Sequence, residues 1–241
     1  MSPPTSREFL DVGDFARLDL GRGLRTGIPE IVLAEGKSDA HLREIVAAFT
    51  REGGRVLVSR LAPERLPLVE ACGAPVRYEE RARLAVAGAG RARRTGGTVV
   101  ILAGGTADVP VCEEARVVAQ ELGCEVQTAY DVGVAGLRRL FGALPLLEGA
   151  DAVVVAAGRE GTLPAIVAGL SPAPVIGLPV SVGYGVGGGG QAALYSMLQS
   201  CAPLTLVNVD AGVVAGACAA QIANRAALAR RRAAPAPEAV P

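Results

Sequence analysis

The sequence of 241 residues contains no tryptophan, one histidine and few aromatic residues. Phe and Tyr together make up only 3% of the chain, so Ala, Val, Leu and Gly must fill any core. His41 is the one imidazole, which removes most Ser-His-Asp and Cys-His arrangements and any His-ligated metal site. Catalysis by this chain must therefore use carboxylates, hydroxyls, thiols, Lys or Arg.

The sequence also lacks an excess of charge and any long apolar run. The formal net charge is zero, so no broad basic field indicates a nucleic-acid partner. No apolar run approaches the roughly 20 residues of a membrane span, and no charged-then-apolar leader is present. The cysteines are five, an odd number, and form no CxxC pair, which argues against a disulfide framework and a zinc cage. We expect a cytoplasmic protein without membrane or nucleic-acid partners.

The front of the chain predicts an N-terminal extension over residues 1–27, with a helix packed on the body, and a small α/β domain over residues 28–90. Ser38 is the expected N-cap of the first helix of that domain. A Gly/Arg-rich stretch at residues 88–96 is the best linker candidate. The expected elements are strands at 29–33 and 55–59, helices at 38–52 and 63–72, and edge strands at 76–80 and 84–87.

Residues 97–226 predict a flavodoxin-like, doubly wound parallel sheet of about five strands, because short apolar runs alternate with helical patterns. A strand order of 2-1-3-4-5 is a common solution for five such units. The Ala/Pro-rich segment 227–241 is predicted to be disordered. The expected strands are 98–103, 125–130, 152–157, 174–178 and 205–209, and the expected helices are 107–122, 136–141, 164–170, 190–199 and 211–225.

Glu160 lies in a glycine-punctuated turn, GREGTL at residues 158–163, directly after an unbroken apolar strand. The carboxyl ends of such strands are where open α/β folds keep their ligands. With the strand order 2-1-3-4-5, this turn meets the loop GGTAD at residues 104–108 at the switch point of the sheet. The loop at residues 179–185 lies next door, so Glu160 is the reference for every other candidate residue.

Gly104, Gly105 and Thr106 open a helix, where unpaired N–H groups and the helix dipole favour a phosphate. The alternative is a plain strand-to-helix turn, with Asp108 as a carboxylate of the helix start. The loop is neither a Walker motif nor a GxGxxG fingerprint. Residues 187–190 are four glycines, which fit a flexible lid and a linker equally well.

Cys201 lies between the fourth helix and the fifth strand of the predicted sheet. A thiol there is usually a buried small hydrophobe, and its position is at the amino end of the sheet, away from Glu160 of the same chain. If Cys201 is catalytic, we expect a neighbouring subunit to supply it. Cys112, Cys124 and Cys218 lie on helix or strand patterns and are expected in the core.

Three segments, GGTAD at 104–108, GREGTLP at 158–164 and VIGLPV at 175–180, resemble the aminoimidazole ribonucleotide carboxylase/mutase family of purine synthesis. That family has a histidine directly before the Leu-Pro, where this chain has Thr162. A closer resemblance, over roughly residues 15–225, is to the pyridinium-3,5-biscarboxylic acid mononucleotide synthase family (LarB), which serves nickel-pincer nucleotide biosynthesis and lactate racemase maturation. The further segments that carry it are Pro29-Glu30, residues 35–37, 130–136, 181–185, 200–202 and 208–210.

The closer resemblance implies a carboxylase/hydrolase of the transferase class that acts on nicotinic acid adenine dinucleotide. The pyridinium ring gains a second carboxylate from CO2 or bicarbonate, and the phosphoanhydride is hydrolysed to release AMP. Cys201 matches the covalent catalyst of that family. The chemistry also needs a base and anion-binding groups. Glu160 or Asp108 fits the base, while Gly104, Gly105, Thr106, Gly161, Ser181, Gly183 and Tyr184 are the candidates for substrate binding.

The expected cofactor is Mg²⁺ at the phosphoanhydride, near Asp108, with no ATP or biotin; the sequence fixes no metal ligands. Arg25 and Lys37 can reach a nucleotide or can equally be solvated surface residues. We expect a homo-oligomer with shared active sites, such as an octamer, because Cys201 and Glu160 are predicted at opposite ends of one sheet. The alternatives are a purine carboxylase/mutase and a non-catalytic nucleotide-binding module.

Overall fold

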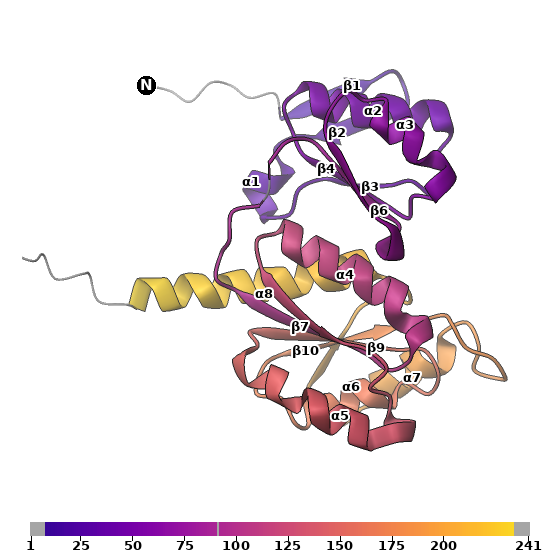
Figure 1. Cartoon of the computed structure of the whole chain (residues 1–241), viewed down its shortest axis with the longest axis vertical. Helices are drawn as coiled ribbons and strands as arrows, with labels where there is room; N and C mark the ends of the chain where they lie inside the picture. Colours follow the sequence, from indigo (N-terminus) through magenta and orange to yellow (C-terminus); the bar gives the residue numbers. More distant parts are fainter. Residues whose placement is uncertain (1–7, 91, 234–241) are drawn as a thin grey trace, which may run out of the picture. The chain divides into compact units, whose positions relative to one another are not determined.

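The structure is a computed structural model that describes residues 8–90 and 92–233 (Figure 1). The chain divides into two compact units, Met1–Arg91 and Ala92–Pro241. Within the described residues, none of the helices has the length and apolar character that crossing a membrane requires.

The first unit contains a two-stranded hairpin and a four-stranded sheet of order β3-β4-β6-β5. The hairpin strands are antiparallel, β3 runs parallel to β4, and β6 runs antiparallel to both of its neighbours. The strands are β1 (Phe9–Val12), β2 (Ala16–Asp19), β3 (Ile31–Leu33), β4 (Val56–Ser59), β5 (Val76–Glu79) and β6 (Leu84–Ala87).

Two predictions for the first unit are wrong. Within residues 8–27, the β1–β2 hairpin and the short α1 (Arg22–Thr26) replace the expected helix, and residues 1–7 lie outside the described residues. Alternate hairpin residues face the core, where Val12 and Leu18 are buried, and this period of two is the pattern of a strand. Residues 84–87 form a central strand rather than an edge, since all four side chains are buried between β4 and β5.

The helices of the first unit follow their sequence signals. α2 (Asp39–Arg51) begins after Ser38, whose hydroxyl accepts a hydrogen bond from the His41 N–H at 3.2 Å, which confirms the predicted N-cap. The helix expected at 63–72 is split into a 3-10 turn and α3 (Leu66–Glu70), with Pro67 in the first turn of α3, where its missing N–H is tolerated.

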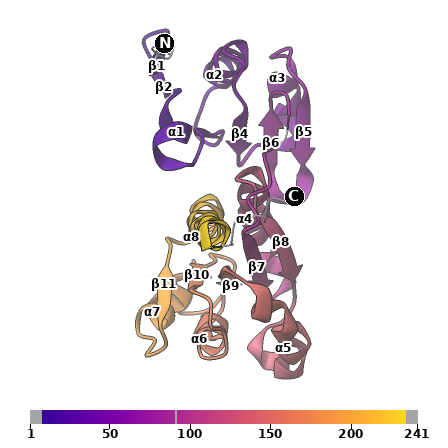
Figure 2. The same ribbon diagram turned by 90° about the vertical axis from the view of Figure 1, so that its left-hand side faces the viewer.

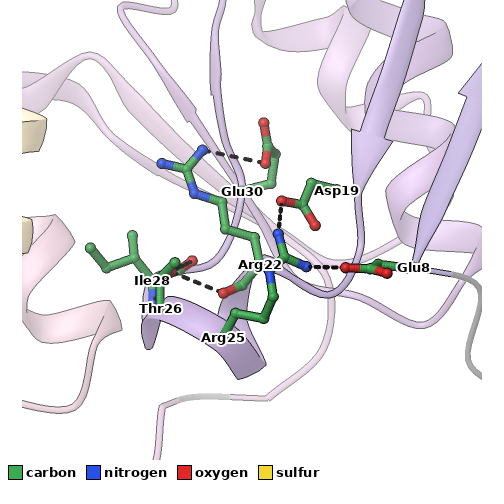
Figure 3. Close-up of polar contacts among 7 residues, drawn as sticks. All are labelled: Glu8, Asp19, Arg22, Arg25, Thr26, Ile28 and Glu30. Atoms are coloured by element: carbon green, nitrogen blue, oxygen red, sulfur yellow. Dashed lines mark hydrogen bonds and ion pairs between the residues drawn. The ribbon is translucent and has the colours of Figure 1, made fainter.

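Arg25 ties the beginning of the first unit together (Figure 3). Its guanidinium bonds to Glu8 at 2.9 Å and to Asp19 at 2.5 Å, while Arg22 reaches Glu30 at 3.5 Å. The sequence left Arg25 open as a nucleotide contact or a solvated residue. In the structure it pairs with two carboxylates of its own unit.

The second unit is built on a five-stranded, wholly parallel sheet of order β11-β10-β9-β7-β8. Numbered along the chain, this is the predicted order 2-1-3-4-5 read from the far edge, so the flavodoxin-like fold is confirmed. The strands are β7 (Thr98–Ala103), β8 (Glu125–Ala129), β9 (Ala152–Ala157), β10 (Val175–Pro179) and β11 (Leu204–Leu206).

Helices cover both faces of this sheet (Figures 1 and 2). Along β7, Val99 and Ile101 pack into the core under α4 and α8, whereas Val100 and Leu102 pack into the core under α5, α6 and α7. Burial on both faces explains the continuous apolar runs in the sequence. The helices are α4 (Val109–Glu121), α5 (Leu137–Ala143), α6 (Thr162–Ala168), α7 (Gln191–Leu198) and α8 (Gly212–Ala233).

Small residues allow α4 and α8 to lie against each other. A Cβ added at Gly212 would lie 2.5 Å from the Val111 carbonyl oxygen, and one at Gly216 would overlap the Ala115 carbonyl. Ala215 and Ala219 of α8 are fully buried in the same core. Close backbone approach thus replaces the large aromatic side chains that this chain lacks.

The prediction of a disordered segment from residue 227 is wrong for residues 227–233, which continue α8. Residues 234–241 lie outside the described residues. Ala227 is buried, and the Arg230 guanidinium bonds to Asp151 and, at 3.0 Å, to the Gly96 carbonyl. These contacts hold the last turns of α8 against the start of the sheet.

Asp151 supplies the first stability prediction. Its carboxylate accepts from the Thr98 N–H at 2.9 Å, and the hydrogen bond from Arg230 lowers the pKa of Asp151 below its usual range. Asp151→Asn should lower the stability of the second unit by about 1 kcal/mol at pH 7. Because the folded-state pKa is lowered, this contribution is present above the unfolded pKa and fades as pH falls below about 5.

Thermal unfolding of wild type and Asp151→Asn between pH 7 and pH 3 measures this effect. Glu148→Gln removes an exposed carboxylate of the same unit as the matched control, and should leave the melting temperature unchanged. A stability gap between wild type and Asp151→Asn that stays constant with pH would contradict the role of the ion pair.

Candidate functional site

A cavity of about 720 Å³ opens at the carboxyl ends of the parallel strands. Its walls come from the four loops after β7, β8, β9 and β10, at residues 104–108, 131–135, 157–161 and 182–184. This is the end of the sheet where the strand order reverses between β7 and β9. The cavity lies wholly within the second unit.

Asp108 is the buried carboxylate of this cavity. Its Oδ2 accepts a hydrogen bond from the Gly105 N–H at 2.9 Å, so Asp108 closes the turn at the start of α4, as one alternative from the sequence held. A Cβ added at Gly104 would lie 3.3 Å from Oδ2 and one at Gly158 would lie 3.1 Å from Oδ1. Both glycines therefore leave room for the carboxylate.

The protonation of Asp108 is shifted by its surroundings. Burial raises the pKa of the Asp108 carboxyl above its usual range; the Gly105 N–H works against this shift, and the negative charge of Asp210 adds to it. An acid with a raised pKa exchanges protons closer to neutral pH than an exposed aspartate does.

Glu160 is an exposed carboxylate of the cavity, in contrast to the buried Asp108. Gly161, which follows it, has a left-handed φ of 69°. A Cβ there would lie 2.5 Å from the Ala193 carbonyl oxygen of α7. The turn therefore presses its backbone on α7, which fixes the loop that carries Glu160.

Tyr184 and Arg159 lie at the rim of the cavity. The Arg159 guanidinium carbon lies 4.0 Å from the centre of the Tyr184 ring, a cation–π distance. Tyr184 is 77% exposed and Gly183 beside it also lines the cavity. A smaller space of about 200 Å³ adjoins these residues, between the Glu160 turn and Gly187.

Seven of the ten site residues proposed from sequence line the cavity, and three do not. Thr106 is exposed outside it, and the Ser181 N–H donates to Asp210 Oδ1 at 2.8 Å. Cys201 is exposed between α7 and β11, at the opposite end of the sheet. Cys112 and Cys124 are buried, as expected, and Cys218 is partly buried. The seven are Gly104, Gly105, Asp108, Glu160, Gly161, Gly183 and Tyr184.

Three charged residues of the cavity were not singled out from the sequence: Asp131, Arg139 and Arg159. Asp131 follows β8 and forms an ion pair with Arg139 of α5. The sequence did hold a signal for Asp131, because all loops that follow parallel strands lie at the same end of the sheet. The loop after β8 therefore had to lie beside the loops after β7, β9 and β10.

The described residues contain no group of three or more His, Cys, Asp or Glu side chains close enough to hold a metal ion. In the cavity, Asp131 is paired with Arg139, and Asp108 accepts the Gly105 N–H. These residues do not form a metal cage of protein ligands alone. No step of the carboxylation is therefore assigned to Mg²⁺.

Comparisons with known families agree with this architecture. The family model "AIR carboxylase" matches residues 98–234, more than half of the chain. The chain belongs to the AIR carboxylase family. Residues 9–90 match the model "LarB/PurE-like N-terminal domain". Together the two matches make this protein a LarB/PurE-like member of a carboxylase and mutase family.

Two relatives are similar in sequence. "Uncharacterized protein MJ0165" of Methanocaldococcus jannaschii is 33% identical over 225 residues, which cover 90% of this chain and 87% of the relative. "Probable N5-carboxyaminoimidazole ribonucleotide mutase" of Methanothermobacter thermautotrophicus is 32% identical over 132 residues, which cover 52% of this chain and 37% of the relative. The first relative spans both units, and the second matches about half of the chain.

The backbone of the Glu160 turn gives a second prediction. Gly161→Ala should destabilise the protein by about 2 kcal/mol or more, because φ is positive and the new Cβ would strike Ala193. Gly142→Ala is the control: nothing lies within 4 Å of its Cβ position in α5, so it should stabilise by about 0.5 kcal/mol. Calorimetry of both variants tests this, and equal effects would contradict it.

The buried Asp108 gives a third prediction, in which stability changes with pH. A raised folded-state pKa means that burial favours the neutral acid, so its contribution is lost as pH rises through that pKa. Asp108→Asn, which keeps an acceptor for the Gly105 N–H, should therefore melt about 2 °C or more above wild type at pH 7. The gain should disappear near the ordinary aspartate pKa of 3.8. A gain that is absent at pH 7 would contradict the burial penalty.

Proposed function

We propose that this protein carboxylates the pyridinium ring of nicotinic acid adenine dinucleotide and hydrolyses its phosphoanhydride. The products are pyridinium-3,5-biscarboxylic acid mononucleotide and AMP, as in nickel-pincer nucleotide biosynthesis. The resemblance of both units to LarB-type sequences supports this substrate. The family match supports carboxylation in general.

One observation carries the choice of reaction: the second unit contains no histidine. Thr162 is the first residue of α6 and stands where the aminoimidazole ribonucleotide carboxylase/mutase family, which this sequence resembles, has a histidine. The one histidine, His41, lies in α2 of the first unit, with its ring stacked on Phe15 at 3.9 Å. A cavity with Asp108 and Glu160 but no imidazole suits a reaction whose proton carriers are carboxylates.

The chemistry asks for a sulfur nucleophile. A pyridinium ring is electron-poor, so it does not attack CO2. When a thiolate adds to the ring, a C–S bond forms and the ring becomes a dihydropyridine with a nucleophilic enamine carbon. That carbon forms the new bond to CO2, a base takes the ring proton, and loss of the thiolate restores the aromatic ring. No oxidant, ATP or biotin is needed.

Glu160 and Asp108 are the candidates for the base. Glu160 is exposed and lines the cavity, which suits a base that must meet a bound ring. Asp108 is buried with a raised pKa, which favours a role as a proton donor or relay. The N–H groups of the glycine loops, with Thr106 and Ser181 nearby and Tyr184 at the rim, are proposed to hold the phosphates and carboxylates.

Cys201 is proposed as the nucleophile, and its place in the fold requires a second copy of the chain. It lies at the amino end of the sheet, whereas the cavity lies at the carboxyl end. Cys201 is exposed, and so is Leu198 at the end of α7, shortly before it in the chain. A homo-oligomer in which one subunit presents Cys201 to the cavity of another, such as an octamer, would complete the site.

A second candidate function is N5-carboxyaminoimidazole ribonucleotide mutase activity. The observation that favours it is the similarity to the Methanothermobacter relative, which is named as a probable mutase of this kind and matches about half of this chain. Both reactions move CO2 to a carbon atom of a nucleotide, so both fit a carboxylate-lined cavity. A non-catalytic nucleotide-binding module is the remaining alternative.

One assay separates these functions. The protein is incubated with nicotinic acid adenine dinucleotide and bicarbonate, and the mixture is analysed by mass spectrometry for AMP and the dicarboxylated mononucleotide. Wild type should form both products, Cys201→Ala should form no dicarboxylated product, and Glu160→Gln should slow turnover by about 100-fold or more. Cys218→Ala, at a partly buried cysteine of α8, is the matched control.

Other outcomes have clear meanings. Turnover of carboxyaminoimidazole ribonucleotide alone would favour the mutase, and nucleotide binding without turnover would favour the binding module. Full activity of Cys201→Ala would reject the thiolate mechanism. Restored activity in a mixture of Cys201→Ala and Glu160→Gln subunits would support sites shared between copies.

A further inference from the structure

An ion pair at the mouth of the cavity has no part in the carboxylation chemistry. Arg139 of α5 and Asp131 after β8 both line the cavity, and an Arg139 N–H donates to Asp131 Oδ2. The two side chains are 46% and 49% exposed. Among the described residues, Arg139 pairs with Asp131 through one N–H, which leaves most of its guanidinium N–H groups available to a ligand.

The backbone is shaped to hold this pair. Asp131 has a left-handed φ of 59°, a conformation that few residues other than Gly, Asn and Asp adopt readily. Gly136 lets the Arg139 side chain fold back across the loop, since a Cβ there would lie 2.7 Å from Arg139 Nε. An aspartate at position 131 and a glycine at position 136 therefore both suit the backbone that brings the two side chains together.

The neighbouring residue anchors the loop from behind. The Tyr130 hydroxyl donates to Glu113 Oε1 of α4 at 2.6 Å, and Arg116 donates to Glu113 Oε2 at 2.8 Å. Burial raises the pKa of Tyr130, so the phenol stays neutral and keeps its donor proton. The hydrogen bond between Tyr130 and Glu113 thus holds the loop that carries Asp131 against α4.

The pair combines a phosphate-binding group, the Arg139 guanidinium, with the negative charge of Asp131, which repels additional negative charge on a ligand. A guanidinium matches phosphate oxygens with parallel N–H donors. Asp131 cancels the net charge of Arg139, so a phosphate that approaches the pair gains hydrogen bonds with little net attraction. Each phosphate of a dinucleotide anhydride carries one negative charge, whereas a terminal phosphomonoester carries close to two at pH 7.5.

We propose that Asp131 and Arg139 form a phosphate subsite that accepts the singly charged phosphates of a dinucleotide and disfavours the doubly charged phosphate of a mononucleotide. This inference rests on the proposed function, in which hydrolysis of the anhydride turns singly charged phosphates into phosphomonoesters. The subsite then binds the substrate and promotes release of the products. Arg139 is the binding residue, and Asp131 determines its charge specificity.

Other charged groups share the cavity and define the controls. Asp108 and Glu160 add negative charge, and Arg159 adds positive charge. They remain in every variant below, so a change of Asp131 alone isolates its effect. Arg138, the exposed neighbour of Arg139, does not line the cavity and is the matched control.

The experiment is isothermal titration calorimetry of the full-length protein at pH 7.5 with nicotinic acid adenine dinucleotide, nicotinic acid mononucleotide and AMP. Asp131→Asn keeps a side chain that tolerates the left-handed backbone. It should tighten both mononucleotides about fivefold and change dinucleotide affinity less than twofold. Arg139→Gln should weaken the dinucleotide about tenfold or more, and Arg138→Gln should change nothing.

A pH arm tests the same charge from the side of the ligand. Near pH 5.5 a phosphomonoester carries close to one charge, so the wild-type preference for the dinucleotide should shrink while that of Asp131→Asn changes little. Gly136→Ala should act like a weaker Arg139→Gln, because it displaces the guanidinium. Circular dichroism checks that each variant is folded.

An unchanged ratio of dinucleotide to mononucleotide affinity in Asp131→Asn would overturn the proposal, as would normal binding by Arg139→Gln. Absence of nucleotide binding by wild type would overturn it as well. Because binding is measured without turnover, the result is separate from the carboxylation assay. A protein that fails to carboxylate but loses its charge preference in Asp131→Asn would keep the subsite and lose the proposed reaction.

Discussion

Backbone-to-backbone contact at the carboxyl edge of the sheet is the constraint on which the cavity depends. A Cβ at Gly133 would overlap the Gly104 carbonyl, and one at Gly158 would overlap the Val182 carbonyl. Gly161 touches α7 in the same way. Each contact joins a loop to the next structural element, so the four loops form one rigid rim. The glycines of this edge therefore allow the close packing of the loops.

The rigid rim lets one small cavity hold carboxylates in different states. Asp108 is buried and hydrogen-bonded, Glu160 is exposed, and Asp131 is neutralised by Arg139. Three acids of similar intrinsic acidity therefore stand in three different environments, and the proposed relay, base and charge filter rest on these differences. This division of roles follows from burial and partners, and it uses no imidazole.

The rest of the second unit supports that rim by packing small residues closely. Alternating Val, Ile and Ala side chains fill both faces of the sheet, and the α4–α8 contact relies on Gly216 and Ala115. The ion pair of Arg230 and Asp151 holds the end of α8 at the amino end of the sheet, where β9 begins. A chain nearly free of aromatic residues thus obtains a dense core from backbone proximity.

The accuracy with which the sequence predicted the secondary structure differs between elements. β7 and β9 were predicted to the residue because strands buried on both faces read as unbroken apolar runs. The β1–β2 hairpin was missed because only alternate residues face the core, and the end of α8 was missed because Arg230 finds its partner 79 residues away. A local sequence pattern reports only burial within its own segment. The packing of the hairpin on the core and the pairing of Arg230 with Asp151 both depend on distant segments.

For the candidate site, the sequence by itself determined the parallel sheet and the loop that carries Glu160, because apolar runs and glycine turns encode them directly, whereas the strand order was taken from the common solution for five such units and confirmed by the structure. Only the tertiary structure decided that Asp108 is buried, that Arg139 folds back to Asp131, and that Thr106 and Ser181 lie outside the cavity. These outcomes depend on side-chain direction and on contacts between distant segments. The physical reason is that a sequence fixes which loop a residue occupies, whereas packing fixes which way its side chain faces.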